Sequence, residues 1–421
     1  MSDAMMTIMQ TLACALSILL MGAIGVQLLW RLVRVLRGKE SADGLHAQLR
    51  APGGELALAA GAGLVSRLAV YLLAFLMMKL VYGESLGLME TLDDLWLHWD
   101  TRHYIGIAEN GYTAVGDERL WLVFFPLFPL LMRAASIVTG DMFLGGLLVS
   151  LLCSCTASAL VYDLGYMHGG KRAARLSVGY FLLNPMSVFL NCAYTEALFI
   201  CLTLAAVCLL RRNRPWLAAL CGMLTSLTRM PGVIIAGLLL IALLGKLPKR
   251  QCTPRAVAAC AGQMMLVFSG LFIYWGINYA VTGDPFIYMT YQKENWFQTP
   301  GSFWQTAATT MRYAIECFGE DDWFFSWFSQ LFAMFSMYVL LAARGRKLPF
   351  DLAAYSFVYV AVVLAPTWLL SGPRYLYALC ALPLLQAGCS ERNGVHAALL
   401  TVSALLLCVY TFGYTIAIAV L

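Results

Sequence analysis

The sequence has few charged residues and no motif of a soluble nucleotide-binding fold. Only 12% of its 421 residues are Asp, Glu, Lys or Arg, against about 25% in an average soluble domain. It contains no Walker A sequence, no glycine-rich dinucleotide loop and no Asp-x-Asp. These absences exclude an ordinary soluble enzyme with a recognisable nucleotide site. We therefore expect any activated donor to come from within the membrane.

Metal-binding and disulfide patterns are also missing. The thirteen cysteines form no Cys-x-x-Cys and no Cys/His cluster, and nearly all of them lie inside apolar runs. Such cysteines behave as small buried hydrophobic residues. Cys317 is the only one expected in an external loop, so no disulfide framework is predicted. No metal or cofactor is predicted either.

Long apolar runs are abundant in the sequence. Hydrophobic residues make up 61% of the chain, in runs long enough for spanning helices. The fold class predicted is an all-α, polytopic integral membrane protein with about 11–12 membrane segments in one domain. A net charge of +5 does not indicate nucleic acid, since the placement of charge matters more in a membrane protein.

The placement of charge predicts the orientation. The apolar run 7–30 has no basic region before it and is too long for a signal peptide, so it is interpreted as a retained helix. Basic residues follow it and place the linker 31–55 in the cytoplasm, whereas residues 83–120 hold eight acidic and only two basic residues. The predicted organisation is an additional N-terminal helix with its cytoplasmic linker, residues 1–56, and a transmembrane domain, residues 57–421. Its external loops are 83–140 and 282–320. The chain is expected in the cell membrane, with any active site on the extracytoplasmic face.

Two apolar stretches do not fit simple spans. The run 121–138 carries two prolines near its start and Arg133 within it, and whether it spans or lies flat stays open. The runs 215–228 and 231–245 are each too short to cross the membrane straight. They are predicted to form a helical hairpin whose tip, with Arg229, lies near the outer leaflet.

The polar run from His98 to Tyr112 is the first candidate site. A helix is predicted from Thr101 to Asn110, ended by Gly111, with Asp100 as its N-cap. The same carboxylate could serve as a general base, and the two roles are compatible. His103 and Tyr104 follow at i+3 and i+4, so they share its helix face.

Arginines at membrane depth form the second group of candidates. A charge there costs at least about 2.5–3.5 kcal/mol, so Arg67 and Arg229 need partners. Arg374, beside Tyr375, follows a rigid Ser-Gly-Pro turn. Guanidinium groups match phosphate oxygens bidentately, which favours a lipid phosphate. Salt bridges to Asp94, Asp100 or Glu196, or snorkelling at the membrane interface, are the alternative.

The second external loop alternates aromatic and polar residues around Lys293 and Trp296. This composition suits a sugar-binding surface and equally an interfacial aromatic belt. The two interpretations stay open at this point.

Several ordered blocks resemble one known family. They are His98-Trp99-Asp100-x-x-His103-Tyr104-x-x-Ile107-Ala108-Glu109-x-Gly111-Tyr112, Phe124-Phe125-Pro126-Leu127-Phe128-Pro129-Leu130, Asn184-Pro185-x-Ser187-Val188-Phe189, Tyr194-Thr195-Glu196-Ala197-Leu198-Phe199, Leu227-Thr228-Arg229 and Pro373-Arg374-Tyr375. This series, covering about residues 65–385, resembles the phosphatidylinositol-glycan class V mannosyltransferases, which add the second mannose to GPI anchors. That family belongs to the C-type glycosyltransferase superfamily.

The resemblance implies an inverting glycosyltransferase with C-type glycosyltransferase architecture. It would use a polyprenyl- or dolichyl-phosphate sugar as donor, a glycan or glycolipid as acceptor, and an essential acidic residue in the first external loop, which Asp100 matches. The expected substrate-binding residues are Trp99, Arg102, His103, Tyr104, Glu196, Lys293 and Trp296. The expected lipid-phosphate-binding residues are Arg67, Arg229, Arg374 and Tyr375. The rival hypothesis is a transporter or flippase of a lipid-linked or anionic solute that uses the same arginines.

Overall fold

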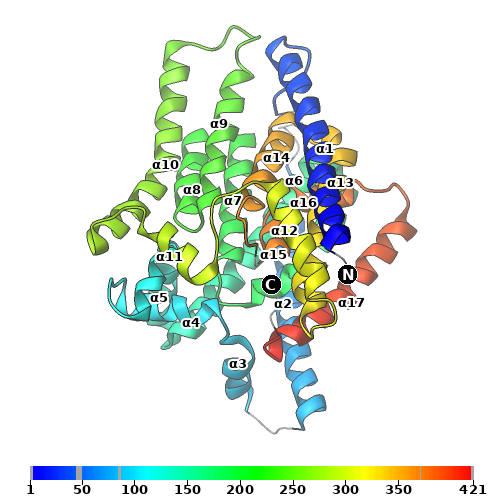
Figure 1. Cartoon of the computed structure of the whole chain (residues 1–421). Helices are drawn as coiled ribbons and strands as arrows, with labels where there is room; N and C mark the ends of the chain where they lie inside the picture. Colours follow the sequence, from blue (N-terminus) through cyan, green and yellow to red (C-terminus); the bar gives the residue numbers. More distant parts are fainter. Residues whose placement is uncertain (1–2, 44–49, 84–86, 370, 419–421) are drawn as a thin grey trace.

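All regular secondary structure in the described part of the chain is helical. The computed structural model describes residues 3–43, 50–83, 87–369 and 371–418, and within these ranges it contains no strand (Figure 1). The predicted all-α membrane fold is confirmed. Among the described residues, six helical segments are long and apolar enough to cross a membrane, or up to eight if each of two bent pairs is one span. The six lie in α1 (Asp3–Leu36), α2 (Gly53–Tyr82), α6 (Met142–Leu183), α10 (Pro254–Thr282), the π-helical turn Phe324–Phe328 with α13 (Ser329–Arg344), and α17 (Asn393–Thr415).

The longest helix, α6, is two helices joined by a tight reversal. Gly169 and Gly170 have non-helical backbone angles, and Gly170 has φ +68°. A Cβ added to Gly165 would lie 2.9 Å from the Cα of Ala174, although a straight helix would separate these residues by about 13 Å. The chain therefore reverses at these two glycines. This reversal partly explains why the number of long helices is below the predicted 11–12 segments.

Sharp bends define two further segments. The 3₁₀-helix η1 (Asp117–Val123) and α5 (Leu127–Thr139) meet at 105°, and η2 (Pro185–Asn191) and α7 (Glu196–Arg211) meet at 101°. The run 121–138 is therefore not one straight helix, because Pro126 and Pro129 remove backbone donors at the bend. One side of α5 exposes Leu130, Ile137 and Val138.

Shorter apolar helices fill the space between the long ones. The expected break between the runs 215–228 and 231–245 is present, and Arg229 lies in it, between α8 and η3. A Cβ on Gly232 would lie 2.5 Å from the backbone of Thr225 and Ser226, so only glycine fits this close return. The helices involved are α8 (Pro215–Ser226), η3 (Met230–Ile234), α9 (Ile235–Leu244), α14 (Phe350–Val363), α15 (Gly372–Tyr377) and α16 (Leu382–Ala387).

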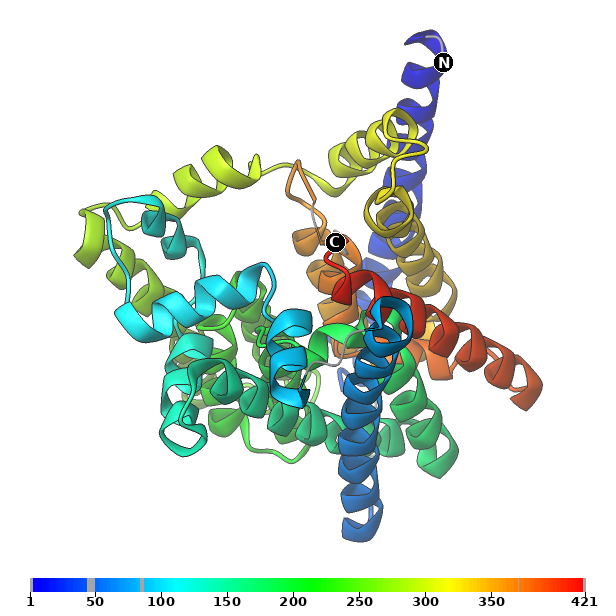
Figure 2. The same cartoon turned by 90° about the horizontal axis from the view of Figure 1, so that it is seen from below.

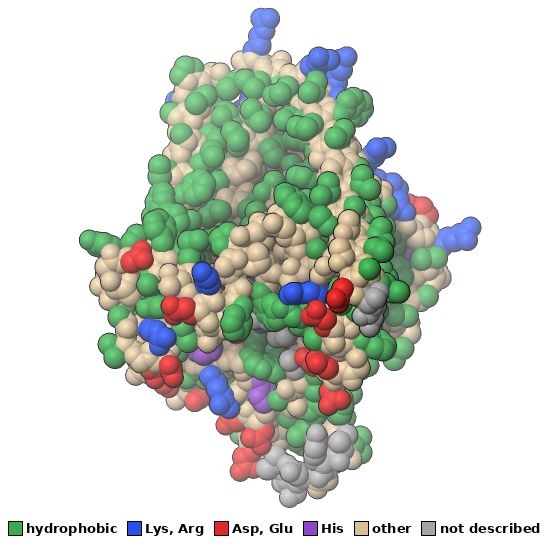
Figure 3. Space-filling view, in the orientation of Figure 1, with side chains coloured by type: hydrophobic (Ala, Val, Ile, Leu, Met, Phe, Trp, Pro, Cys, Tyr) green, Lys and Arg blue, Asp and Glu red, His purple; other side chains and the backbone are tan. Residues whose placement is uncertain are grey.

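Charge separates the two ends of the molecule. The α9–α10 connection, which contains Lys246, Lys249 and Arg250, lies at the top of Figure 1, and α3 lies at the bottom. We call these the basic end and the acidic end. Figure 3 shows acidic side chains mostly in the lower part of the molecule, below a hydrophobic middle. The acidic end is built by the short helices α3 (Leu88–Trp96), α4 (Asp100–Asn110), α11 (Ile287–Trp296) and α12 (Phe303–Glu316).

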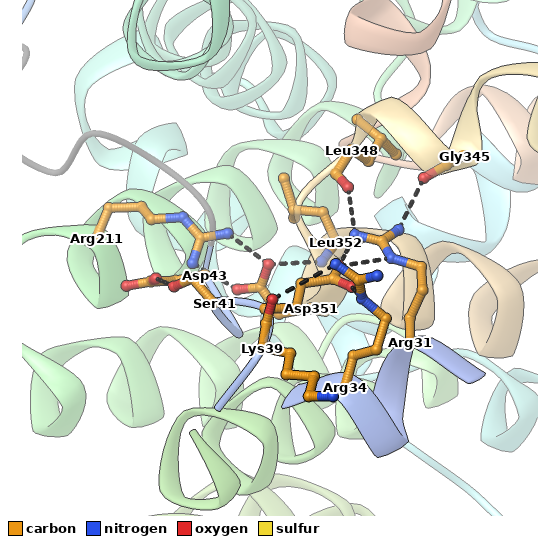
Figure 4. Close-up of polar contacts among 11 residues, drawn as sticks. Arg31, Arg34, Lys39, Ser41, Asp43, Arg211, Gly345, Leu348, Asp351 and Leu352 are labelled. Atoms are coloured by element: carbon orange, nitrogen blue, oxygen red, sulfur yellow. Dashed lines mark hydrogen bonds and ion pairs between the residues drawn. The ribbon is translucent and has the colours of Figure 1, made fainter. Parts of the chain in front are cut away.

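Buried polar contacts fasten the C-terminal end of α1 to the rest of the chain (Figure 4). Arg31 donates to the carbonyl oxygens of Gly345 at 3.1 Å and Leu348 at 2.9 Å. Beside them, Arg211 at the end of α7 pairs with Asp351 at the start of α14 through both carboxylate oxygens. These contacts hold the ends of α1, α7 and α14 together.

Candidate active site

Four segments far apart in the sequence meet in one ionic cluster, which consists of Asp100, Glu196, Arg229 and Arg374. Arg374 Nη2 lies 3.0 Å from Asp100 Oδ2, and Arg374 Nε lies 2.8 Å from Glu196 Oε1. Arg229 pairs with the same oxygen of Glu196. The carrier segments, α4, the start of α7, the α8–η3 break and α15, come together near the centre of Figure 2. The salt bridges that the sequence left open as the alternative to a lipid phosphate, those to Asp100 and Glu196, are therefore present.

Burial increases from one side of the ionic cluster to the other. The Asp100 side chain is 24% exposed, Arg229 14%, Arg374 10% and Glu196 0%. Two carboxylates and two guanidinium groups sum to zero charge. Pairing is required because an unpaired ion at this depth is costly. Asp100 forms the open side of the cluster, and Glu196 forms its floor.

Arg229 and Arg374 are also held by neutral groups. Arg229 Nε donates to Thr195 Oγ1 at 2.7 Å, and the ring of Tyr375 lies 5.2 Å from its guanidinium carbon. Arg374 stacks near Phe189, Tyr194 and Tyr375 at 5.2–5.5 Å, which is within cation–π range. Among the described residues, the buried Nη1 of Arg229 has no acceptor. One donor is therefore free to take an additional anionic oxygen.

The predicted helix after Asp100 is present, but the predicted cap is wrong. Helix α4 spans Asp100–Asn110 and ends at Gly111, as expected, but Trp99 occupies the N-cap position and no side chain caps the helix. Trp99 has φ +43°, an uncommon conformation for a non-glycine residue. The Asp100 carboxylate is directed to Arg374 instead of to the backbone N–H groups of its own helix.

Aromatic rings line the face of α4 beyond Asp100. The ring of Phe124 stacks on His103 at 5.0 Å and meets the edges of Tyr104 at 5.2 Å and Trp296 at 5.9 Å. Burial lowers the pKa of His103, and the nearby Asp100 carboxylate opposes that shift. His103 is therefore a neutral, half-buried ring near the ionic cluster. Phe124 was not among the expected site residues, although it lies in the Phe-Phe-Pro block.

Tyr414 is another contact that the sequence did not indicate. It lies near the end of α17, and its ring contacts Trp99 at 5.2 Å and His98 at 5.8 Å. Burial lowers the pKa of His98, and the positive charge of Arg102 adds to this shift. No sequence pattern links residues 98–99 to the last helix, because this contact is set by tertiary packing alone.

Three expected site residues lie outside the ionic cluster and outside the aromatic rings that line α4. Arg67 is fully buried and donates to Asn191 Oδ1 at 2.8 Å and to the carbonyl oxygens of Leu182 and Ser187. Arg102 Nε donates to the Leu97 carbonyl oxygen at 3.3 Å and is exposed. Lys293 is also exposed on α11. The structure thus places Arg67 against η2, away from the acidic partners of the other arginines.

Part of the sequence that forms the ionic cluster matches a known protein family. Residues 87–273 match the family described as "Mannosyltransferase (PIG-V)", and this segment includes Asp100, Glu196 and Arg229. Within the residues that the structure describes, no group of three or more His, Cys, Asp or Glu is placed to hold a metal ion.

Curated relatives match between 34% and 38% of the chain. The chain is 34% identical over 155 residues to the "GPI alpha-1,6-mannosyltransferase 2" of Cricetulus griseus, which is 34% of this chain and 31% of that protein. It is 32% identical to the Mus musculus protein over 38% of this chain and 34% of the relative. It is 32% identical to the Homo sapiens protein over 34% and 30%. The chain thus matches about a third of the length of these relatives. No solved structure matches.

Proposed function

We propose that this chain, a PIG-V family member, is a membrane mannosyltransferase that uses a polyprenyl-phosphate mannose as donor. The relatives are named as α-1,6-mannosyltransferases, which supports mannose as the sugar. The acceptor is a hydroxyl group of a glycan or glycolipid. The observation that supports this most is the ion pair of Arg374 with Asp100 at the open side of the ionic cluster.

Arg374 and Arg229 bind the donor phosphate. Their guanidinium groups lie side by side on Glu196, and Arg229 Nη1 is free of acceptors among the described residues. An arriving phosphate supplies charge-assisted hydrogen bonds that compete with the Asp100 carboxylate for Arg374. Donor binding therefore releases Asp100 from its ion pair.

Asp100 is the general base of a single displacement. The acceptor hydroxyl oxygen forms a bond to C1 of mannose while its proton moves to the Asp100 carboxylate. The bond between C1 and the phosphate oxygen breaks, and the polyprenyl phosphate leaves with the electron pair. The arginines stabilise the charge that develops on this leaving group. An α product formed with inversion requires a β-linked donor.

The aromatic residues around Asp100 hold the sugars. Trp99 is 37% exposed next to Asp100, and His103, Tyr104 and Trp296 are connected through Phe124. Aromatic side chains have few rotamers, and their ring faces suit stacking against sugar rings. Arg67, with its hydrogen bonds to η2, supports the frame and takes no part in phosphate binding.

The reaction takes place on the extracytoplasmic face of the cell membrane. The ionic cluster includes the start of α4, which lies at the acidic end of the molecule. Basic residues gather at the opposite end, as the positive-inside rule requires of the cytoplasmic side.

Purified protein in lipid nanodiscs, with a short-chain polyprenyl-phosphate mannose and an alkyl mannoside acceptor, tests the function. We expect an α-linked disaccharide from the parent protein. From Asp100→Asn we expect a rate lower by about 10²- to 10⁴-fold, because the base is lost. Donor binding should persist in that variant. Full activity of Asp100→Asn would refute the assignment of the base. Movement of intact donor between leaflets without transfer would favour a flippase.

A further inference from the structure

Glu196 is the least accessible member of the ionic cluster and the one with two cationic partners. Its side chain is 0% exposed, and its Oε1 contacts both Arg229 and Arg374. Its second oxygen, Oε2, is buried and has no hydrogen-bond partner among the described residues. A substrate cannot reach this carboxylate without displacing an arginine. The expectation that Glu196 binds substrate directly therefore does not fit its place beneath them.

Two guanidinium groups cannot share a buried site without a shared anion. Both arginines reach the same oxygen, so their positive charges lie within a few ångströms of each other and repel strongly at low dielectric. Glu196 neutralises this repulsion from below, and Thr195, the preceding residue, accepts from Nε of Arg229. Both anchors come from the start of α7, where the chain bends by 101° from η2.

Glu196 also directs the remaining donors of Arg374. Glu196 Oε1 lies 2.8 Å from Nε of Arg374, and Nη2 of the same guanidinium lies 3.0 Å from Asp100 Oδ2. The same guanidinium therefore connects a buried carboxylate to a partly exposed one.

We infer that Glu196 is a positioning residue that sets where the donor phosphate binds relative to Asp100. This inference rests on the proposed function and deepens it. Without the charge of Glu196, the phosphate becomes the main counter-ion of both arginines and is drawn toward the floor of the ionic cluster. The donor then binds, but C1 of its sugar lies too far from the acceptor oxygen that Asp100 activates.

Glu196→Gln tests this inference, because glutamine keeps the shape and removes the charge. With the short-chain polyprenyl-phosphate mannose, we expect the single-turnover rate to fall on the order of 100-fold, as a misplacement of about 1 Å can cost. The Kd of the donor should not weaken, because both guanidinium charges remain and their shared anion is gone. A purely structural role would lower the folded fraction and leave the rate of the folded, donor-bound protein unchanged.

Glu109→Gln is the matched control, since Glu109 is an exposed carboxylate on α4, the helix that begins at Asp100. Its rate and donor Kd should equal those of the parent. A normal single-turnover rate in Glu196→Gln would overturn the inference. An equal loss of rate and donor affinity would also overturn it, because Glu196 would then be a donor ligand. If Glu196→Gln does not fold, Glu196→Asp provides the test. It keeps the charge but cannot reach both arginines, so its rate should fall while its Kd holds, and an unchanged rate would overturn the inference.

The Asp100→Asn experiment separates the two proposals. If Asp100→Asn is inactive and Glu196→Gln is normal, the positioning role alone fails. If Asp100→Asn is fully active, the proposed catalytic mechanism itself fails.

Discussion

Replacing Arg374 by lysine removes the connection between the two carboxylates while keeping the positive charge. The guanidinium now contacts Asp100 through Nη2 and Glu196 through Nε, at 3.0 and 2.8 Å. A lysine has a single nitrogen at the end of a flexible stem and cannot reproduce this fork. We therefore expect Arg374→Lys to fold but to lose the planar donor set that binds the phosphate.

The size of the effect follows from the contacts. A hydrogen bond to a charged group contributes about 1.5–3 kcal/mol, and each 1.4 kcal/mol changes Kd about tenfold. The loss of one such bond to the phosphate predicts a donor Kd weaker by about 10- to 100-fold. The catalytic rate should fall as well, because Asp100 then faces a mobile ammonium group.

The assay is equilibrium binding of the short-chain polyprenyl-phosphate mannose to protein in nanodiscs, with single-turnover transfer in parallel. Arg133→Lys is the matched control, because Arg133 is exposed on α5, and it should equal the parent in both measurements. A donor Kd within twofold of the parent in Arg374→Lys, with normal transfer, would refute the reasoning that the arginine fork holds the phosphate.

Three further substitutions test the frame and the surroundings of the ionic cluster. Arg67→Met should destabilise the fold by about 3 kcal/mol, because buried carbonyl acceptors lose their hydrogen-bond donor. The Kd of the folded fraction for the polyprenyl-phosphate mannose should stay normal. Weakened binding of this lipid in a stable protein would make Arg67 a phosphate ligand. Arg211→Met should lower the free energy of unfolding by about 3–5 kcal/mol, because it leaves Asp351 buried and unpaired. Adding Asp351→Leu to this variant should recover most of the lost stability. A double variant no more stable than the single one would contradict this. In the unfolded chain the pKa of His103 is about 6.5, and burial lowers this pKa in the folded protein. The unfolded state therefore binds the proton more tightly, so the stability contribution of the neutral ring is complete above about pH 6.5 and is lost as the pH falls below it. The unfolding temperature should therefore drop less between pH 8 and pH 5 in His103→Phe than in the parent, and equal drops would exclude His103 as a cause.

Much of the fold could be predicted from apolar run length and charge placement. The break at Arg229 was expected because the apolar runs on either side of it are too short to span, whereas the reversal at Gly169–Gly170 is visible only in the structure. The count of long spans was not predictable, because short helices such as α14 are stabilised by neighbours rather than by their own length. The bend at η2 depends on Arg67 donating to η2 oxygens, a contact that no local pattern encodes.

The members of the ionic cluster, and salt bridges among them, were predictable, but which carboxylate pairs with which arginine was not. Asp100 was singled out as a candidate base, Arg229 as a charge at membrane depth, and Arg374 as a guanidinium after a rigid turn. The structure joins Asp100 to Arg374, and joins Arg374 and Arg229 through Glu196. Which residue lies deepest depends on how α7 starts, and this is set by tertiary packing. The same holds for Tyr414 and Phe124, which belong to the surroundings of Asp100 only through the folded chain.

The most direct test is a structure of the parent protein with a non-transferable phosphonate analogue of polyprenyl-phosphate mannose. Our account predicts phosphonate oxygens within hydrogen-bond distance of Arg374 and Arg229, with the contact between Arg374 and Asp100 broken and Glu196 still beneath both arginines. A phosphonate bound elsewhere, with the ion pair between Arg374 and Asp100 intact, would contradict it.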